Sequence, residues 1–520
     1  MSRHPQAVPL LQDHLSQAAE REPGKVALVC GEERFTYAEL DQRASALSRT
    51  LSDLGVERGD RVMVFGDNGP QVVLSFWAAL KAGGIITIIN PQTKSDKLSF
   101  LLADCQPSAL LADARLRRVF AEPLGRSAHL KGLVTWGTKE PPQGLACPRV
   151  LGFEEASVSA RGAPLQKSRI DLDLAAIVYT SGSTGEPKGV MLTHRNMLTA
   201  SLSISSYLEM RADDVIINVL PFSFDYGLYQ MIMTFRVGGR LVLERSFTYP
   251  AQVLSRIHKE RVTGFPGVPT LFSILTSLTD LSAYDFDSVR FVTNTAAALF
   301  PKHVATIRRL FPRARVYSMY GLTECKRISF LPPEEIDTRP DSVGLPIPNT
   351  EIWVVDEAGL RLGPDQVGQL VVRGATVMAG YWGRPEESEL RLRPGPLPGE
   401  RVLYTGDYAR IDADGYLYFV GRMDDIIKSR GEKVAPREIE KVLTEIPGVK
   451  EAAVIGVPDE ILGQAAKAFV VLEPGCQLTE AQVMQECQKR LEGFMVPKYI
   501  EFRAEFPKTT TGKIQKTALS

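Results

Sequence analysis

Hydroxyl-bearing and glycine residues follow one another between positions 179 and 189, in the order Tyr-Thr-Ser-Gly-Ser-Thr-Gly-Glu-Pro-Lys-Gly. Glycine lets a backbone turn sharply, and the consecutive N–H groups of such a turn form a concave site for anions. The hydroxyl groups can donate further hydrogen bonds, and the lysine adds a positive charge. The segment is therefore predicted to be a loop that binds phosphate groups. The candidate phosphate-binding residues are Thr180, Ser181, Gly182, Ser183, Thr184, Gly185 and Lys188.

The residues on either side of this loop predict how it is held. An apolar run at 174–178 leads into it and a second run at 190–192 follows it, and such runs are typical of buried strands. Thr193 or Asn196 is then a candidate cap for the start of a helix. The loop differs from the common nucleotide loop G-x-x-x-x-G-K-[ST], because position 187 is proline. A flexible Ser/Gly linker is the alternative, but linkers seldom carry Pro-Lys-Gly between two apolar runs.

With its flanks, this stretch resembles the phosphate loop of the AMP-forming (adenylate-forming) ligase superfamily. That superfamily contains acyl-CoA synthetases, the adenylation domains that load carrier proteins, and the beetle luciferases. The motifs described below extend the resemblance over nearly the whole chain. The resemblance implies an ATP-binding enzyme in which Thr180 and Lys188 are among the catalytic residues.

A second motif, Tyr-Gly-Leu-Thr-Glu at 320–324, matches the superfamily pattern Y-G-x-T-E. The resemblance implies that Tyr320 stacks on adenine next to Gly321, and that Thr323 contacts the α-phosphate. It also implies that Glu324 is catalytic and holds Mg²⁺. This role is chemically sensible, because ATP brings about four negative charges and Mg²⁺ prefers one or two carboxylates together with phosphate oxygens.

Small residues upstream of this motif, at 294–298, are similar to the adenine-binding turn of the superfamily. There, small side chains let the base lie against the backbone, and the resemblance implies that Thr295, Ala296 and Ala297 do so here. The first position of the turn is usually glycine or alanine, and in this chain it is Asn294.

The ribose of the nucleotide is the next group to place. Tyr-Thr-Gly-Asp at 404–407 matches the superfamily's T-G-D, whose aspartate binds both ribose hydroxyls, so the resemblance assigns this role to Asp407. A carboxylate that accepts two hydroxyl hydrogen bonds is a natural ribose clamp, as in dinucleotide folds. The resemblance also implies that Arg422 contacts ribose or phosphate.

The C-terminal segment resembles the mobile part of the superfamily. The resemblance implies that the chain pivots between a large and a small domain at Asp424, and hinges are often residues at the ends of elements. It also implies that Gly431 and Lys433 lie in the segment that faces the thiol acceptor during thioester formation. Pro-Lys-Thr-Thr-Thr-Gly-Lys at 507–513 is similar to P-x-T-x-x-G-K, whose last lysine, here Lys513, is catalytic for adenylation and contacts ATP.

Asp225 lies among aromatic and apolar residues in Phe-Ser-Phe-Asp-Tyr-Gly at 222–227. A buried carboxylate without a partner is costly, so Asp225 is either a helix N-cap or a counter-ion for a substrate cation. Members of the superfamily that activate amino acids carry aspartate at this position, where it holds the substrate amine. The candidate substrate-pocket residues are Phe224, Asp225, Tyr229, Val292, Asn294, Met319 and Arg327.

Lys326 and Arg327 follow the second motif directly, where the pocket wall is expected. Two cations are unusual in an apolar acyl tunnel, so we expect both side chains to face solvent. The alternative is that Arg327 pairs with Asp225 or with an acidic group on the substrate.

Strands alternate with helices through the first 340 residues, which indicates an α/β fold with doubly wound, mainly parallel sheets. Thr36 and Glu39 form a capping-box pattern at one helix start. Short strands separated by turns between 344 and 420 predict a small β-barrel or open sheet. We expect a large domain at 1–423, with subdomains at about 1–170, 171–340 and 341–423, and a small mobile α+β domain at 424–520.

The composition excludes several other classes of protein. Lys+Arg and Asp+Glu are 61 each among 520 residues, so net charge gives no reason to expect binding to nucleic acid or to an acidic membrane. No apolar run approaches the roughly 18 residues of a spanning helix. The six cysteines are scattered without a C-x-x-C pair, so we expect reduced thiols in a cytoplasmic protein.

Together, the motifs predict a two-step enzyme. A carboxylic acid, either an acyl acid or an amino acid, attacks the α-phosphate of ATP and pyrophosphate leaves. The small domain then alternates its position about Asp424, and a phosphopantetheine thiol of CoA or of a carrier protein displaces AMP. Three alternatives stay open: an enzyme that strictly loads a carrier protein, a luciferase-like oxygenase, and an ATP sensor without turnover.

Overall fold

The computed structural model describes residues 10–158, 169–181, 187–276, 278, 281, 283–295, 299, 301–429, 432–459, 462–509 and 513–519. The chain divides into two compact units. The first consists of Met1–Ile336, Ile347–Thr350 and Arg373–Leu403, and the second of Asp337–Pro346, Glu351–Val372 and Tyr404–Ser520. The domain and subdomain boundaries predicted above stay a proposal.

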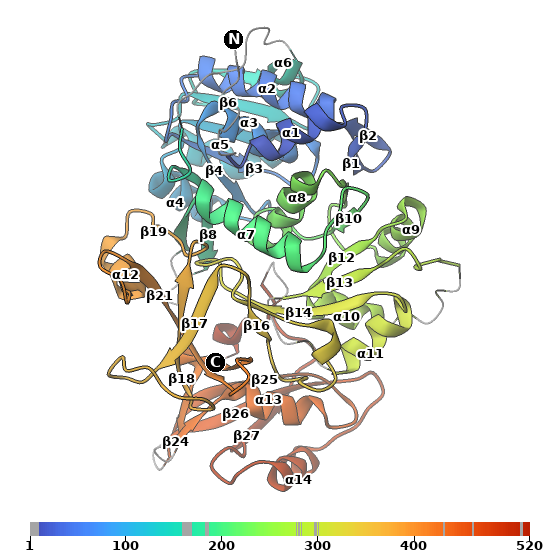
Figure 1. Cartoon of the computed structure of the whole chain (residues 1–520), viewed down its shortest axis with the longest axis vertical. Coiled ribbons are helices and arrows are strands. Elements are labelled where there is room, and N and C mark those ends of the chain that lie inside the picture. The colour runs from blue at the N-terminus through green and yellow to red at the C-terminus, as the bar shows by residue number, and fades with distance from the viewer. Residues whose placement is uncertain are drawn as a thin grey trace. The chain divides into compact units, whose positions relative to one another are not determined.

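One sheet of the first unit has the strand order β19-β9-β8-β4-β3-β5-β6-β7 (Figure 1). Strands β3 to β8 run parallel to one another, and β9 and β19 are antiparallel to their neighbours. The central strand β4 has the sequence Ile-Ile-Thr-Ile-Ile, as expected for a strand buried on both faces. The strands are β3 (Arg61–Phe65), β4 (Ile85–Ile89), β5 (Ala109–Asp113), β6 (Gly132–Trp136), β7 (Val150–Gly152), β8 (Leu174–Ser181), β9 (Pro187–Thr193) and β19 (Gly380–Tyr381).

Helices cover this sheet. Apolar residues of α4 and α5 form one core cluster with β3, β5 and β6. The predicted capping box of Thr36 and Glu39 is confirmed at the start of α2, where both reciprocal hydrogen bonds are present. The helices in this part of the chain are α1 (Asp13–Arg21), α2 (Tyr37–Asp53), α3 (Pro70–Ala82), α4 (Ser95–Cys105), α5 (Arg117–Gly125) and α6 (Phe153–Val158).

A second sheet of the first unit has the order β15-β14-β13-β12-β10-β11-β1-β2. Its strands are parallel except for β2 and β15, which lie at the two ends of this order. The strands are β1 (Val26–Cys30), β2 (Glu33–Thr36), β10 (Val215–Asn218), β11 (Arg240–Leu243), β12 (Gly264–Gly267), β13 (Phe291–Asn294), β14 (Arg315–Tyr320) and β15 (Ser329–Leu331). The helices are α7 (His194–Tyr207), α8 (Asp225–Val237), α9 (Pro250–Glu260), α10 (Pro269–Thr276) and α11 (Pro301–Leu310).

Aromatic residues join the two halves of the first unit. The ring of Trp77 on α3 stacks on Phe235 of α8 at a centroid distance of 5.7 Å. Tyr37 on α2 meets Phe235 edge-on at 5.5 Å, and its buried hydroxyl donates to the carbonyl of Gly239 at 2.6 Å. Large buried rings with a satisfied polar end dominate core packing. Helix α8 is thereby fixed to the helices of the other sheet, and α8 carries the first residues of the predicted substrate pocket.

The predicted run of short strands between 344 and 420 forms a small sheet. Its order is β17-β18-β21, and β22 pairs with β21. Within the first unit, β20 pairs with the first residues of β21, from Arg401 to Leu403. The elements of this sheet are β17 (Thr350–Val355), β18 (Gly368–Gly374), β20 (Leu392–Pro394), β21 (Arg401–Ile411) and β22 (Leu417–Arg422), and the same stretch of chain also contains β16 (Leu345–Pro346) and α12 (Pro385–Arg391).

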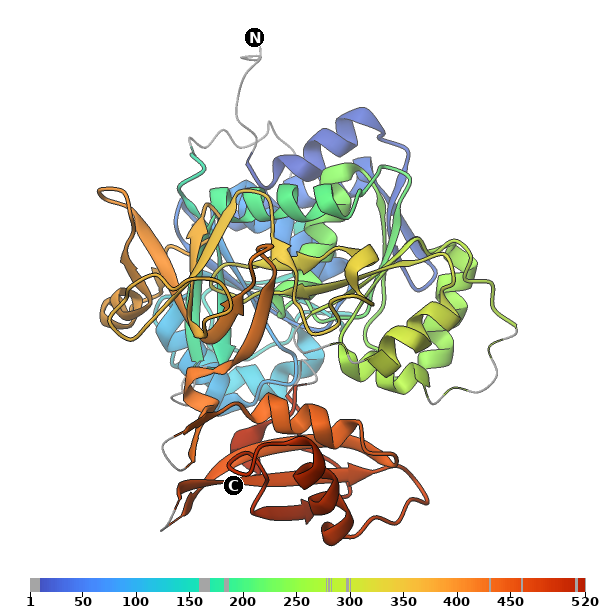
Figure 2. The same ribbon diagram turned by 60° about the horizontal axis from the view of Figure 1, so that its bottom comes forward.

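The C-terminal part of the second unit is a small α+β structure, drawn in orange and red in Figure 2. Its strand order is β24-β23-β26-β25, and β27 pairs parallel to β26. Residues of α13, α14 and the strands share one apolar core. The elements are β23 (Ile427–Ser429), β24 (Glu432–Val434), α13 (Pro436–Thr444), β25 (Val449–Asp459), β26 (Gly463–Leu472), α14 (Glu480–Arg490) and β27 (Tyr499–Phe502).

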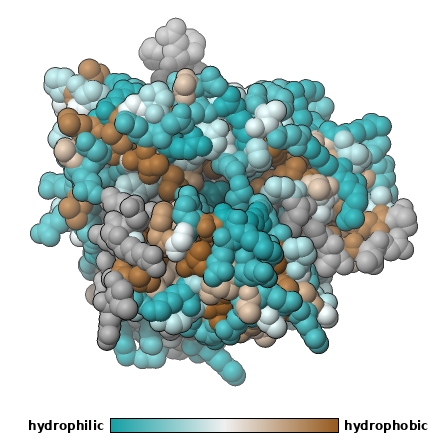
Figure 3. Space-filling model, turned by 90° about the horizontal axis from the view of Figure 1, so that it is seen from below, coloured by the Kyte–Doolittle hydropathy of each residue, from teal (hydrophilic) through white to brown (hydrophobic). Residues whose placement is uncertain are grey.

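Hydrophilic residues cover much of the face shown in Figure 3, with hydrophobic residues in small groups between them. Across the described ranges, no helix is both long and apolar enough to cross a bilayer. The six cysteines are free thiols in the structure.

Candidate active site

The predicted phosphate loop joins the antiparallel strands β8 and β9. Thr180 lies directly opposite Lys188 in the register of the two strands, and the Thr180 hydroxyl donates to the Lys188 carbonyl at 3.5 Å. Ser181 pairs with Pro187 at the end of the ladder. The loop residues Gly182, Ser183, Thr184 and Gly185 lie outside the described residues, as does the side chain of Ser181. After β9, Thr193 is the N-cap of α7 and Asn196 completes its capping box.

Lys188 is held by an anion and an aromatic ring. Its ammonium group forms an ion pair with Glu387 of α12. It also lies 5.8 Å from the centre of the Tyr381 ring, within the range of a cation–π contact. A phosphate group that binds Lys188 therefore has to compete with the Glu387 carboxylate.

Glu324 lies at the hydroxyl end of the Tyr381 side chain. The Tyr381 hydroxyl donates to Glu324 Oε1 at 2.8 Å, and the Met378 N–H donates to the Glu324 carbonyl at 2.7 Å. Burial, followed by the negative charge of Glu324, raises the pKa of Tyr381 well above its ordinary value, so the hydroxyl keeps its proton and donates. Tyr381 thus brings the predicted phosphate-binding lysine and the predicted magnesium-binding carboxylate together.

Sequence reasoning missed Tyr381. It lies in β19, where Tyr381 pairs with Val190 of β9. The next residue, Trp382, donates its backbone N–H to the Gly189 carbonyl at 2.7 Å. The only local signal is a Gly-Tyr-Trp triplet about 55 residues after Glu324, and a neutral aromatic residue is far more often part of a core than of a site.

The 320–324 motif begins a loop that closes on itself. The Ile328 N–H donates to the Tyr320 carbonyl at 2.9 Å, and the Cys325 N–H donates to the Leu322 carbonyl at 3.1 Å. A side chain at Gly321 would place its Cβ 2.4 Å from the Lys326 carbonyl oxygen, so only glycine fits there. The motif residues, including Thr323, stay half-buried and reachable, while the returning strand of the loop packs behind them.

The expectation that Lys326 and Arg327 face solvent is wrong. They are only 4% and 2% exposed. Lys326 adopts a left-handed backbone conformation with φ of 58°, and this turn directs both side chains into the interior. The Lys326 ammonium donates to Asp225 Oδ2 at 3.3 Å, so the pairing considered for Arg327 is made by its neighbour instead. Arg327 donates to the hydroxyl of Thr295 at 2.5 Å.

Asp225 is the first residue of α8, and Phe224 occupies the N-cap position without a side-chain cap. The N-cap interpretation of Asp225 is therefore wrong. Asp225 is 7% exposed, and its counter-ion is a side chain of the same protein. Lys326 also lies 4.2 Å from the centre of the Tyr229 ring. Burial, opposed by Asp225, lowers the pKa of Lys326 to about 7, which marks a strongly perturbed group.

The remaining predicted pocket residues do not all point toward α8. Thr293 faces α8, because its hydroxyl lies 2.6 Å from the Tyr226 hydroxyl. Successive strand residues point to opposite faces, so Val292 and Asn294, although buried, point away from α8. Met319 Sδ accepts from the Tyr207 hydroxyl at 2.9 Å. Of the predicted adenine turn, Thr295 is buried, whereas Ala296 and Ala297 lie outside the described residues.

The predicted ribose-binding pair comes together within the second unit. Asp407 of β21 and Arg422 of β22 are directly opposite in register, and Arg422 Nε lies 3.5 Å from Asp407 Oδ1. Asp407 is 2% exposed. A buried carboxylate next to a half-exposed guanidinium fits a site for hydroxyl and phosphate groups.

The structure describes only some of the residues that were predicted to act in the mobile domain. The backbone of Asp424 lies in a short 3₁₀ turn, Met423–Asp425, and Lys433 lies in β24. The side chains of both, and all of Gly431, lie outside the described residues. Lys513 is exposed in a turn where the Thr509 N–H donates to the Lys513 carbonyl at 2.8 Å.

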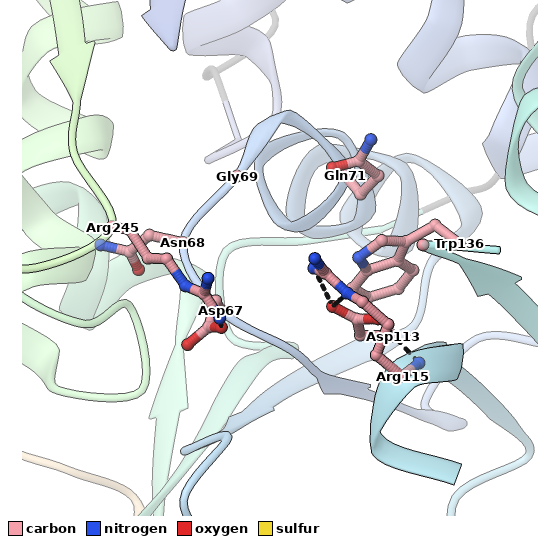
Figure 4. A pocket seen from close by; sticks show the side chains of 9 residues that line it. Asp67, Asn68, Gly69, Gln71, Asp113, Arg115, Trp136 and Arg245 are labelled. Atoms are coloured by element: carbon pink, nitrogen blue, oxygen red, sulfur yellow. Dashed lines mark hydrogen bonds and ion pairs between the residues drawn. The ribbon is translucent and has the colours of Figure 1, made fainter. Parts of the chain in front are cut away.

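A surface pocket of about 220 Å³ lies elsewhere in the first unit (Figure 4). Its charged residues form internal pairs: Arg115 with Asp113 at 2.5 Å, and Arg245 with Asp67. None of the predicted site residues lines it. The candidate site lies away from this pocket and is defined by the contacts of Tyr381 and of Lys326.

Comparison with known proteins identifies the family. The model of the AMP-binding enzyme family matches residues 15–382, and the model of the AMP-binding enzyme C-terminal domain matches residues 438–513. The chain belongs to the AMP-binding enzyme family. It is 31% identical to a long-chain-fatty-acid–CoA ligase from Bacillus subtilis (strain 168), over 98% of this chain and 94% of that protein.

Two further relatives show how widely the family varies. A feruloyl-CoA synthase from Amycolatopsis sp is 32% identical, over 96% of each chain. The crystal structure of an anthranilate CoA ligase in complex with anthranoyl-AMP matches with a TM-score of 0.89 and 27% identity, over 100% of this chain and 98% of that chain. These similarities confirm the predicted fold class and an AMP-forming acid–thiol ligase. The named acids of these relatives differ from one another, so the family does not define the acid used here.

Proposed function

We propose that this enzyme activates a carboxylic acid with ATP and Mg²⁺ and transfers the acyl group to the thiol of CoA. The observation that carries the proposal is Tyr381, which donates to Glu324 while its ring lies against Lys188. A carboxylate can bind the metal ion of a metal–triphosphate, and a neighbouring ammonium group can bind its phosphate oxygens. CoA is the proposed acceptor because the relatives described above are named as CoA ligases or synthases.

The residues present fit a magnesium ion. Mg²⁺ prefers one or two carboxylate ligands together with phosphate oxygens and water, and Glu324 supplies a carboxylate that a neutral hydroxyl already orients. The ion would neutralise charge on the phosphate groups. Within the described residues, no group of three His, Cys, Asp or Glu side chains could hold a metal by itself, so the proposed coordination includes phosphate oxygens of the nucleotide.

The first step forms the acyl-adenylate. A carboxylate oxygen of the acid attacks the α-phosphorus, the bond from the α-phosphorus to the bridging oxygen breaks, and pyrophosphate leaves. Negative charge grows on the phosphate oxygens in the transition state, and preorganised cations stabilise it there more than in the ground state. We assign this role to Lys188 and Lys513, with Thr180 as a hydrogen-bond donor.

The second step forms the thioester. The thiol sulfur attacks the acyl carbon, the bond from that carbon to the AMP oxygen breaks, and the thiol proton passes to solvent. Asp407 would bind the ribose hydroxyls in both steps, and the segment around Gly431 and Lys433 would face the thiol after a rotation about Asp424. The Asp225–Lys326 pair removes the main reason to expect an amino acid as substrate, and with it the argument for a carrier protein.

The proposal is tested by incubating the enzyme with ATP, Mg²⁺, CoA and a panel of carboxylic acids, and by measuring AMP and acyl-CoA. At saturating acid, we expect AMP and acyl-CoA in equal amounts, and we expect them only when CoA is present. Glu324→Gln, which keeps the size of the side chain, should lower the rate by 100-fold or more, since preorganised electrostatic groups are typically worth about that much. Acyl-adenylate that accumulates and is not consumed by CoA would overturn CoA as the acceptor.

A further inference from the structure

Three buried side chains at the start of α8 and the end of the 320–328 loop have no role in the nucleotide chemistry. They are Tyr229, Lys326 and Arg327, which we call the cationic anchor. We propose that the cationic anchor binds a second carboxylate at the far end of the substrate, so that the enzyme selects dicarboxylic acids. This inference rests on the proposed function and names the class of acid that the same site takes.

The charges of the cluster do not balance. Among the residues that the structure describes, Asp225 forms an ion pair with Lys326, at 3.3 Å. Arg327 is 2% exposed, yet it donates to the neutral hydroxyl of Thr295, and no carboxylate in the described ranges forms an ion pair with it. A buried charge without a counter-ion is strongly unfavourable. A carboxylate brought by the substrate would neutralise it.

Two hydrogen-bond donors in the anchor have no acceptor. Arg327 Nε and the Tyr229 hydroxyl are both buried and find no partner among the residues that the structure describes. Buried donors in native proteins are nearly always paired, and exceptions often mark functional sites. Both donors serve a carboxylate, which accepts several hydrogen bonds at once. An ammonium group would instead add positive charge to a positive cluster.

The backbone of the loop holds the anchor behind the adenylation motif. Gly321 packs on the Lys326 carbonyl and on the Arg327 Cα, at 2.4 and 2.8 Å from the position of a Cβ atom. The left-handed conformation of Lys326 is uncommon for a residue with a side chain. Such a conformation persists only where the surroundings enforce it, and it is frequent at sites of function. An acid with its reacting carboxylate at the motif would thus direct its other end toward α8.

A comparison of matched acids tests this proposal. The rate of acyl-CoA formation is measured with glutarate, adipate and pimelate, and with the monoacids and ω-amino acids of the same chain lengths. We expect kcat/KM for the preferred diacid to exceed that of its monoacid by 100-fold or more, and the ω-amino acid to be the poorest. A second charge-assisted hydrogen-bonding group is commonly worth a discrimination of that size.

Two variants separate binding from folding. Tyr229→Phe removes one hydroxyl that has no partner, and should lower the ratio of diacid to monoacid kcat/KM by about 10-fold. Tyr226→Phe is the matched control on the same helix, because its hydroxyl is already bonded to Thr293, and it should leave this ratio unchanged. Circular dichroism and the unfolding temperature check that both variants fold.

The possible outcomes separate a failure of the cationic anchor from a failure of the proposed ligase function. If monoacids are converted to CoA thioesters as well as diacids are, or if Tyr229→Phe keeps the wild-type ratio, the cationic anchor is refuted while the ligase function stands. If ω-amino acids are preferred, Asp225 binds an amine after all and the anchor is refuted. If neither series yields a thioester or AMP, the cationic anchor is refuted, and the ligase function fails only if the wider panel of carboxylic acids described above also yields no AMP and no acyl-CoA.

Discussion

Replacing Tyr381 with phenylalanine removes a single hydroxyl from the candidate site. That hydroxyl donates to the Glu324 carboxylate at 2.8 Å, and a hydrogen bond to a charged group contributes about 1.5–3 kcal/mol. The ring remains, so its contact with Lys188 at 5.8 Å is kept. If the bond orients Glu324 for the adenylation step, its full value is lost from the transition state. The rate of adenylation should then fall by roughly 10- to 150-fold.

The same change should affect stability less than activity. Glu324 is half-buried, so water can replace the lost donor, and the free energy of unfolding should fall by less than about 1.5 kcal/mol. Adenylation is measured as pyrophosphate release at saturating ATP, and unfolding by urea titration. Tyr37→Phe is the control, because its hydroxyl bonds the Gly239 carbonyl far along the chain from the site. Wild-type activity in Tyr381→Phe, or an equal loss in Tyr37→Phe, would refute the positioning role.

Three further predictions follow from the 320–328 loop and from Lys188. Burial lowers the pKa of Lys326 to about 7, so the folded protein loses the Lys326 proton at a lower pH than the unfolded chain does. The contribution of Lys326 to the free energy of unfolding should therefore rise as the pH increases above 7. Urea titrations at pH 7 and pH 9 measure this rise, and a rise that does not change between wild type and Lys326→Met would contradict it. Gly321→Ala should cost about 2 kcal/mol or more in a urea titration, because the new methyl group meets backbone atoms; a cost below about 0.5 kcal/mol would mean that the loop yields. Glu387→Gln should free Lys188 and lower the KM for ATP by about 3-fold, whereas a raised KM would show that Glu387 helps to bind the nucleotide.

Local patterns predicted much of the fold and part of the site. The capping box of Thr36 and Glu39 depends on residues three apart and is present as expected. The phosphate loop was recognised from consecutive residues, and its two flanking runs form β8 and β9. Asp407 and Arg422 were chosen from separate motifs and lie opposite each other, because a single antiparallel pair of strands joins them.

The features that sequence reasoning missed depend on distant partners. Lys326 was expected at the surface because two cations are unusual in an apolar acyl tunnel, and nothing near it in the chain shows that its partner Asp225 lies 101 residues earlier. The turn that directs Lys326 inward is a backbone conformation that lysine seldom adopts. Tyr381 has no charge, and its partner Glu324 lies 57 residues away. No periodic pattern encodes contacts of this kind.

The most direct test of the central claim is to compare wild-type enzyme with Lys513→Ala in a reaction that contains ATP, Mg²⁺, CoA and the preferred acid. The account predicts one AMP, one pyrophosphate and one acyl-CoA per turnover for the wild type. It predicts that Lys513→Ala binds ATP with nearly unchanged affinity but releases pyrophosphate at least 100-fold more slowly. Release of ADP and phosphate, or full adenylation by Lys513→Ala, would contradict it.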